Sequence, residues 1–286
     1  MRVLILGVTG LLGNVLFRVL SCERQIEAFG TFRSASDIDY FAAELTKKLI
    51  KVRDLENLTE LNGLIARVMP DVVINCISLS RKQHQDISRL IDIYAIFPQR
   101  LFGVCSKFGI RVIQISSDGV FSGKTGNYSE ADIPDATDAY GKAKILGEIA
   151  GRNAVNLRVS LIGHELKSED GLLMWFLKQK RECKCYTNAI FSGFPSVVFS
   201  QIVRDFILPN SKIEGTYHVA SSAISKYDLL MLINHQYKRS ITLLPDDSVV
   251  IDRSLQSMRF ESVSGYRPPS WENMIEQMFN FRNWSR

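Results

Sequence analysis

The chain has 286 residues, of which 46% are hydrophobic and 23% charged, and these proportions are ordinary for a globular protein with a buried core. Its formal net charge of +5 suits an anionic small-molecule ligand. Lysine and arginine are scattered along the chain, so the charge does not predict a nucleic-acid partner. No stretch reaches the roughly 20 apolar residues of a membrane span, and the N-terminal apolar run is too short for a signal peptide. We therefore expect a cytoplasmic protein with no membrane partner.

The first 160 residues alternate strand signals with helix signals. Short apolar runs are typical of buried parallel strands, and the longer segments between them have apolar residues at helical spacing. The expected strands are Val3–Leu6, Ile26–Phe32, Leu49–Val52, Asp71–Asn75, Ile110–Ile115 and Val155–Val159. The expected helices are Leu11–Leu20, Asn57–Val68, Ile87–Phe108 and Ala139–Gly151. This alternation predicts an α/β fold with a Rossmann-type, doubly wound parallel sheet.

The regular alternation ends near residue 160. Further helical segments are expected at Leu172–Lys178, Val198–Phe206 and Trp271–Phe281, with a short strand at Thr216–Val219. Another helix is expected over Lys226–Gln236, with Ser225 as its N-cap and Asp228 in the position of a capping-box acid. We predict a Rossmann domain over residues 1–160 and a smaller C-terminal substrate-binding lobe over residues 161–286. The boundary is approximate, because elements of the second half can return to the sheet.

Cysteine and histidine spacing predicts neither a disulfide framework nor a metal site. The five cysteines are Cys22, Cys76, Cys105, Cys183 and Cys185, an odd set whose last pair is too closely spaced for a zinc knuckle. Free thiols in a reducing compartment are expected. The four histidines form no HExxH pattern or facial triad, so no metal is expected.

A glycine-rich turn directly follows the first expected strand and opens the first expected helix. Its glycines stand at positions 7, 10 and 13. Glycine permits a tight turn, lets backbone N–H groups approach a pyrophosphate and allows close helix–sheet packing, while the helix N-terminus favours negative charge. A glycine trio also occurs in purely structural turns, but its place in a βαβ pattern favours a dinucleotide site. The expected contacts in this turn are Gly7, Thr9, Gly10, Leu11, Leu12 and Gly13.

The end of the second expected strand indicates which dinucleotide is bound. An NAD site usually has Asp or Glu there, whereas this chain has Arg33 and Ser34, which suit a 2′-phosphate. A solvated strand-end arginine is the structural alternative. We expect NADPH as the cofactor, with NADH as the alternative. Asp54 is expected to accept a bond from the adenine or to serve as a turn residue, and Asn75 and Ser78 end the fourth strand beside the cofactor.

Tyr140 and Lys144 form the second candidate element. Residues four apart share one face of a helix, so Lys144 can bind the nicotinamide ribose while its charge lowers the pKa of the Tyr140 phenol. Such a pair is common by chance, and its location decides its meaning. The helix follows the fifth strand, whose carboxyl end carries Ser116 and Ser117. Ligands of parallel sheets bind at this edge, so Ser117 is expected beside Tyr140, donating to a substrate oxygen; turn chemistry is the alternative.

These residues together resemble the extended short-chain dehydrogenase/reductase superfamily, and within it the dTDP-4-dehydrorhamnose reductase group. The matching segments also include 71–75, 126–130 and 157–163. The resemblance implies NADPH-dependent reduction of the C4 ketone of a 6-deoxy sugar nucleotide, in surface-polysaccharide or deoxysugar biosynthesis. Tyr140 would supply the proton, and Ser117 and Asp118 would orient the sugar. The catalytic set implied is therefore Ser117, Tyr140 and Lys144.

The expected partner is a small-molecule sugar nucleotide, and a homodimer is left open. Candidates for holding the nucleotide or the sugar are Ser78, Asp118, Arg158, His164, Trp175, Lys178, Ser192 and Gly193. Each taken singly has a structural alternative. Trp175, for example, stands at helical spacing with apolar neighbours, as a core residue would.

Two positions depart from the reductase pattern. Gly119 stands where these reductases usually have an aromatic residue or cysteine, and Tyr94 stands four residues before Pro98, where they usually have asparagine. The departures keep open a cofactor-binding regulatory subunit without catalysis, since the β subunit of methionine adenosyltransferase resembles the same reductases. An NAD-dependent sugar-nucleotide epimerase is a further alternative, which Arg33 disfavours. Dehydration is disfavoured because Asp118 is followed by glycine and not by glutamate.

Overall fold

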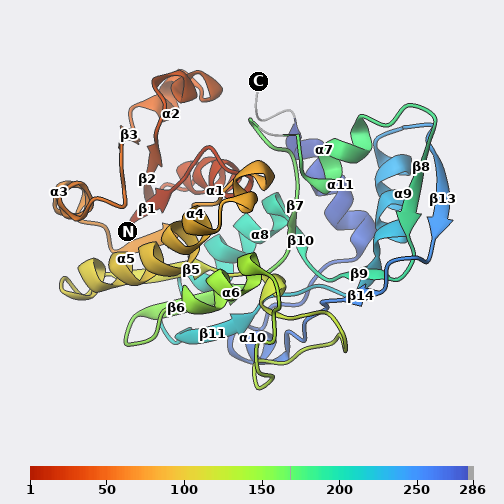
Figure 1. Ribbon diagram of the computed structural model, residues 1–286. Coiled ribbons are helices and arrows are strands. Elements are labelled where there is room, and N and C mark those ends of the chain that lie inside the picture. Colours follow the sequence, from red (N-terminus) through yellow and green to blue (C-terminus); the bar gives the residue numbers. More distant parts are fainter. Residues whose placement is uncertain (168, 283–286) are drawn as a thin grey trace.

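The short apolar runs of the N-terminal half form one parallel sheet. The computed structural model describes residues 1–167 and 169–282, and within them the sheet order is β11-β6-β5-β4-β1-β2-β3. Every neighbouring pair is parallel. The strands are β1 (Arg2–Leu6), β2 (Glu27–Phe32), β3 (Leu49–Lys51), β4 (Val72–Asn75), β5 (Arg111–Ile115), β6 (Ala154–Arg158) and β11 (Gly215–His218). The chain builds outward on both sides of β1, which confirms the predicted doubly wound α/β fold (Figure 1).

Helices cover both faces of this sheet. Val3 and Ile5 of β1 pack with α1 (Leu11–Ser21) and with α8 (Ser196–Ile202), which comes from the second half of the chain. Leu4 and Leu6, which alternate with them, pack with α3 (Leu58–Val68) and α5 (Phe97–Ser106). Residues of β1 are therefore buried on both sides, as a continuous apolar strand requires.

The helix predicted over residues 87–108 is divided. α4 (Ile87–Ile91) passes through a π-helical turn, η3 (Asp92–Ile96), into α5. Pro98 explains the wide turn, because it has no N–H to donate to the Tyr94 carbonyl four residues earlier. That carbonyl packs against Gly147, where an added Cβ would lie 1.7 Å from the Tyr94 oxygen. α6 (Ala139–Leu146) ends at this glycine and does not extend to residue 151 as predicted.

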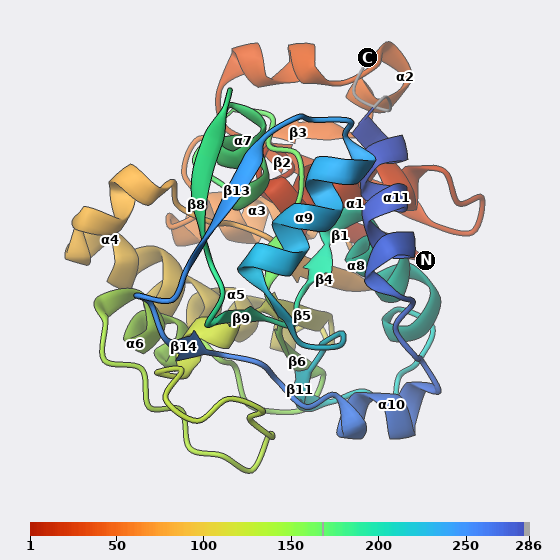
Figure 2. The ribbon, with the colours of Figure 1, turned by 90° about the vertical axis from the view of Figure 1, so that its right-hand side faces the viewer.

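The second half of the chain returns to the sheet and also forms small sheets of its own. β8 (Glu182–Tyr186) pairs with β13 (Thr242–Asp246), and β9 (Ala189–Phe191) lies between β12 (Ile224–Ser225) and β14 (Ile251–Asp252). α9 (Lys226–Gln236) packs on β8 and β13 (Figure 2). Ser225 caps α9 as predicted, its hydroxyl accepting the Asp228 N–H at 3.0 Å. β11, which belongs to the second half of the chain, pairs with β6 and so extends the central sheet. The domain boundary near residue 160 stays a prediction.

The remaining elements are mostly short, apart from α11, which packs against α8 and α9. They are η1 (Ala35–Tyr40), α2 (Ala43–Thr46), η2 (Arg81–Gln85), η4 (Asp118–Val120), β7 (Leu161–Ile162), α7 (Leu172–Leu177), β10 (Phe194–Pro195), η5 (Val203–Ile207), α10 (Met258–Ser264) and α11 (Trp271–Phe281). α8 and η5 correspond to the helix predicted from residue 198. Among the described residues, none of the helices is both long enough and apolar enough to cross a membrane.

Candidate functional site

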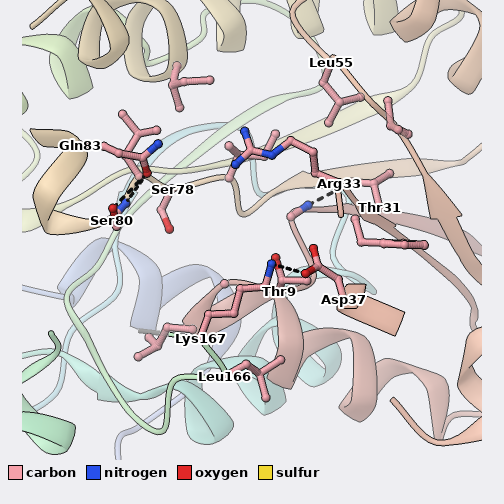
Figure 3. A pocket seen from close by; sticks show the side chains of 18 of the residues that line it. Thr9, Thr31, Arg33, Asp37, Leu55, Ser78, Ser80, Gln83, Leu166 and Lys167 are labelled. Atoms are coloured by element: carbon pink, nitrogen blue, oxygen red, sulfur yellow. Dashed lines mark hydrogen bonds and ion pairs between the residues drawn. The ribbon is translucent and has the colours of Figure 1, made fainter. Parts of the chain in front are cut away.

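A cavity of about 380 Å³ opens where β1, β2, β3 and β4 end. Figure 3 shows side chains from several of these strand ends pointing into it. Of the predicted contacts, those that line it are Gly7, Thr9, Gly10, Leu11, Arg33, Asp54 and Ser78. Leu12, Gly13, Ser34 and Asn75 lie outside its lining. The strand-end edge of the sheet therefore holds a space at the place where the sequence predicted a dinucleotide.

The glycine turn has the geometry that its chemistry requires. Gly7 has φ +81°, in the left-handed region, and its N–H donates to the Thr31 hydroxyl at 3.1 Å. A Cβ at Gly13 would lie 2.2 Å from the Gly7 carbonyl oxygen, so no side chain fits there. Gly10 is the N-cap of α1, and no side chain caps the first turn of that helix. Its backbone N–H groups are thus left for a ligand, and they favour an anion.

Two arginines line the cavity where β2 and β3 end. Arg33 follows β2, and Arg53 follows β3, its neighbour in the sheet. Arg53 was missed in the sequence; its signal was its place just after a strand paired with the one that ends at Arg33. Ser34 is occupied locally: its N–H donates to Asp37 at 3.2 Å, where η1 begins. The Asp54 carboxylate accepts the Glu56 N–H at 2.9 Å, so it has the turn role foreseen as its alternative, although it also lines the cavity.

A segment from the second half borders the same cavity. Lys167, in the connection between β7 and α7, forms an ion pair with Asp37 of η1 (Figure 3). The Asp37 side chain is only 4% exposed, so the pair is largely covered on the acidic side. Both residues and Leu166 line the cavity. No motif in the sequence pointed to this contact, which joins residues 130 positions apart.

Ser117, Tyr140 and Lys144 lie together at the carboxyl end of β5. The Ser117 hydroxyl donates to the Asp118 carboxylate at 3.1 Å and accepts the Gly119 N–H at 2.9 Å. Ser117 lies close enough to Tyr140 to lower the pKa of its phenol, and both side chains border the space beside Gly119. The Lys144 ammonium donates to the Ile115 carbonyl at 3.1 Å and lies 6.0 Å from the centre of the Tyr140 ring. The predicted set is thus brought together in space, although none of its three residues lines the cavity.

An aromatic cluster covers Tyr140. The His84 ring of η2 stacks on the Tyr140 ring, with centroids 5.0 Å apart and an interplanar angle of 19°. Tyr94 meets Tyr140 edge to face at 5.3 Å, and its ring also carries the Lys144 ammonium at 4.5 Å. The Tyr94 hydroxyl accepts the Leu79 N–H at 2.7 Å and lies 3.3 Å from His84 Nε2. Tyr94, which departs from the reductase pattern, therefore contacts Lys144 through its ring. It also contacts Leu79 and His84, which belong to the segment over Tyr140.

The pKa values of Tyr140 and Lys144 differ from those expected from the sequence. Burial raises the pKa of Tyr140 above its usual value, with Tyr94 adding to the shift and the hydrogen bond to Ser117 opposing it. Burial lowers the pKa of Lys144 to about 8. The expected lowering of the Tyr140 pKa by Lys144 is therefore wrong for this structure, because removal of the phenol from water is the largest effect and raises that pKa. Burial also raises the pKa of the Asp118 carboxyl, against the pull of Ser117.

Arg158, predicted to contact substrate, is buried behind the site. Its Nε and one terminal nitrogen each bond the Glu148 carboxylate at 2.8 Å, and the other terminal nitrogen lies 3.2 Å from His218 Nε2. Glu148 in turn accepts from the Ser116 hydroxyl at 2.7 Å. This network ties the ends of β5, β6 and β11 to α6, and it gives Arg158 the place of a structural residue.

The other lobe candidates have local structural partners or are exposed, and they do not converge on the cavity. Ser192 accepts the Leu255 N–H at 3.0 Å, and a Cβ at Gly193 would lie 2.0 Å from the Ser160 carbonyl. Trp175 on α7 is 39% exposed. His164 bonds the Tyr237 hydroxyl at 2.8 Å, with its pKa lowered to about 4 by burial, and Lys178 pairs with Glu169. None of these residues lines the cavity.

Fold and site define a Rossmann-type protein with a ligand-sized cavity beside a buried Ser–Tyr–Lys set. The chain belongs to the family described as RmlD substrate binding domain, whose model matches residues 1–281. The resemblance to the dTDP-4-dehydrorhamnose reductase group is thereby confirmed.

Known relatives include a probable reductase and a subunit of a methionine adenosyltransferase. The chain is 29% identical to the probable low-salt glycan biosynthesis reductase Agl14 of Haloferax volcanii, covering 80% of this chain and 77% of that protein. It is 30% identical to methionine adenosyltransferase 2 subunit beta of Rattus norvegicus, covering 81% of this chain and 71% of that protein. A solved dTDP-4-dehydrorhamnose reductase from Bacillus anthracis, in complex with NADP, has a TM-score of 0.78 at 21% identity and covers 98% of each chain.

Proposed function

We propose that this protein binds NADPH and reduces the C4 ketone of a 4-keto-6-deoxy sugar nucleotide. The observation that carries the proposal is the gathering of Ser117, Tyr140 and Lys144 at the carboxyl end of β5, on the same sheet edge as the glycine turn. The family and the glycan biosynthesis reductase among its relatives support a role in making deoxysugars or surface polysaccharides.

The residues around the cavity fit a phosphorylated dinucleotide. The uncapped first turn of α1 suits the pyrophosphate, because its N–H groups have no side-chain acceptor. Arg33 and Arg53 together suit a 2′-phosphate, since a guanidinium donates to phosphate oxygens in a planar fork. We infer a preference for NADPH over NADH from these two side chains. The neighbouring structure in complex with NADP agrees with this preference.

The chemistry that bound NADPH supplies is hydride donation to the carbonyl carbon of the substrate. Tyr140 holds the proton that the substrate oxygen needs, and its raised pKa keeps it protonated at neutral pH. Ser117 can donate to the same oxygen as negative charge develops there. Lys144, whose ammonium donates to the Ile115 carbonyl, would bind the ribose next to the nicotinamide and so align the cofactor with Tyr140.

The test is NADPH oxidation by the purified protein with a panel of 4-keto-6-deoxy sugar nucleotides carrying thymidine, uridine or guanosine. We expect turnover of one substrate, faster with NADPH than with NADH. Tyr140→Phe should reduce kcat by roughly 100-fold or more, because the proton donor is lost while the ring still fills its place. Retained activity in Tyr140→Phe would contradict the assigned role, and NADPH binding without reduction of any substrate would contradict the reductase.

One observation favours a second candidate, a cofactor-binding regulatory subunit. The His84 ring covers Tyr140, and the chain is 30% identical to methionine adenosyltransferase 2 subunit beta. On this proposal the protein binds NADPH but turns nothing over, and Tyr140→Phe leaves its activity unchanged because there is none. The same assay therefore separates the two functions.

A further inference from the structure

The arginine expected to meet the substrate is buried and bonded to protein partners. All three guanidinium nitrogens of Arg158 have protein partners, two on Glu148 and one at His218. The Arg158 side chain is 6% exposed. A sugar nucleotide carries a diphosphate, and a phosphate that leaves water requires cationic or N–H donors. A different residue must therefore supply the charge for the diphosphate, which the sugar ring separates from the C4 ketone at Tyr140.

Arg253 stands where such a charge is needed. It follows β14, in a segment bonded to the loop that leads from η4 to α6 (Figure 1). The Asp252 N–H donates to the Gly123 carbonyl at 2.8 Å, and the Tyr128 N–H donates to the Ser254 carbonyl at 2.9 Å. A Cβ at Gly123 would lie 3.0 Å from Arg253 Cγ. The arginine is therefore held by backbone bonds on both sides and packs against the loop that joins η4, next to Ser117, to the helix of Tyr140 and Lys144.

The Arg253 guanidinium does not form all the hydrogen bonds that it can donate. Within the described part of the chain, Nε is buried without a hydrogen-bond partner. One terminal nitrogen lies 3.6 Å from the Asp138 carboxylate, which is beyond a good hydrogen bond. Asp118, next to Ser117, feels the same charge. Buried donors in native structures are nearly always satisfied, so the unpaired Nε indicates that this guanidinium has hydrogen-bonding capacity left for an acceptor.

We propose that Arg253 is the anion-binding residue of the substrate site and holds the phosphate oxygens of the sugar nucleotide. The inference rests on the proposed function, because it takes Tyr140 as the reacting end. The side chain is 29% exposed, so part of it is open to a ligand even though Nε is buried. Asp138 is already engaged as the N-cap of α6, accepting the Gly141 N–H at 2.8 Å. Burial raises the pKa of Asp118, which favours its neutral form and reduces repulsion of a nearby phosphate.

A structural role for Arg253 is the competing explanation. On that view the arginine braces Asp138 at the start of α6, and its loss changes stability but not ligand affinity. An exposed ion pair of this length contributes little, so the bracing effect should be small. The two roles therefore predict different results for ligand binding.

The experiment is calorimetric titration of the full chain, saturated with NADP⁺, with dTDP, UDP and GDP as probes. We expect one of them to bind wild type, and Arg253→Gln to weaken that binding about tenfold to a hundredfold. The diphosphate affinity of Arg253→Lys should lie between those of wild type and Arg253→Gln, because lysine keeps the charge and loses the planar guanidinium. Arg259→Gln is the matched control: this arginine lies on α10, bonds the Thr216 carbonyl at 3.0 Å and stacks on Tyr217, so its loss should not alter the affinity.

NADPH affinity, followed by its fluorescence in the same variants, separates this inference from the proposed function. If NADPH binds and Arg253→Gln matches wild type in diphosphate affinity, the inference is overturned while the cofactor site stands. Absence of diphosphate binding to wild type also overturns it. If NADPH does not bind, the proposed function fails, and titration without cofactor still decides the role of Arg253. Arg253→Lys keeps the test available if Arg253→Gln does not fold.

Discussion

Replacing Arg158 tests the structural place that the fold gives it. Arg158→Met keeps most of the buried stem and removes the guanidinium. Glu148 then keeps only the Ser116 hydroxyl of its partners in this network, in a position where its side chain is 13% exposed. A buried carboxylate without its cation is strongly disfavoured, because removal from water is no longer offset.

The expected loss in the free energy of unfolding is about 3–5 kcal/mol, the cost of breaking a buried pair by removing one partner. That is a large share of the roughly 5–15 kcal/mol typical of whole proteins. The double variant Arg158→Met/Glu148→Met removes both charges. It should be more stable than Arg158→Met alone, because the pair itself contributes far less than its breakage costs.

Urea unfolding of wild type, the two single variants and the double variant at pH 7 measures this cycle. A cost below about 1 kcal/mol for Arg158→Met would refute the reasoning, since it would mean that Glu148 is not confined to a buried pair. Diphosphate titration of folded Arg158→Met adds an independent readout. Affinity equal to wild type is expected, whereas a substrate-binding arginine would lose affinity with little change in stability.

Four other perturbations follow from the geometry. Gly13→Ala should lower the free energy of unfolding by more than about 1 kcal/mol and abolish NADPH binding, since its Cβ would meet the Gly7 carbonyl at 2.2 Å. Gly63→Ala on α3, where a Cβ meets nothing within 4 Å, should stabilise by about 0.5–1 kcal/mol in the same urea titration. Wild type should gain stability relative to Lys144→Met as pH rises from about 8, because burial lowers that pKa to about 8 and the unfolded chain alone binds the proton from there to about 10.4. Tyr94→Phe should lower the free energy of unfolding by about 1 kcal/mol. Hydrogen exchange should show lost protection of the Leu79 amide, which donates to the Tyr94 hydroxyl in wild type.

The sequence predicted the elements whose signals are local. The strand at Val3–Leu6 and the glycine turn after it depend on an apolar run and on glycine spacing, which are both visible in the chain. The Ser225 cap is similarly a matter of a few neighbouring residues. Such features follow from backbone chemistry and survive whatever packs around them.

Features that depend on contacts between residues far apart in the sequence could not be predicted from local patterns. The π-helical turn at Tyr94 depends on Pro98 together with the close approach of Gly147, which lies on another helix. The Lys167–Asp37 contact joins two halves of the chain that carry no shared motif. Lowering of the Tyr140 pKa was the wrong expectation because spacing reveals the neighbouring lysine but not the burial that opposes it.

The two arginines show the same limit for the substrate site. Arg158 is the last residue of a buried strand at the expected edge of the sheet, and a sequence pattern shows no more than that. Its commitment to Glu148 appears only when α6 packs beside β6. Arg253 has no motif and reaches the site through pairing of its segment with the loop at Tyr128. Position in the fold, and not residue type, distinguishes the buried structural cation from the one with an unpaired nitrogen.

The cover over Tyr140 does not by itself decide between reductase and regulatory subunit. Uncovering the phenol requires breaking the bond from Leu79 to the Tyr94 hydroxyl and separating the stacked His84 ring. These contacts are worth about 1 kcal/mol each by their type, so opening costs on the order of 2 kcal/mol. A state at that level is populated at a few per cent, which a substrate that binds only the open form can select. A catalytic set closed in the free protein is therefore compatible with turnover, and the assay with sugar nucleotides, not the closed geometry, separates the two functions.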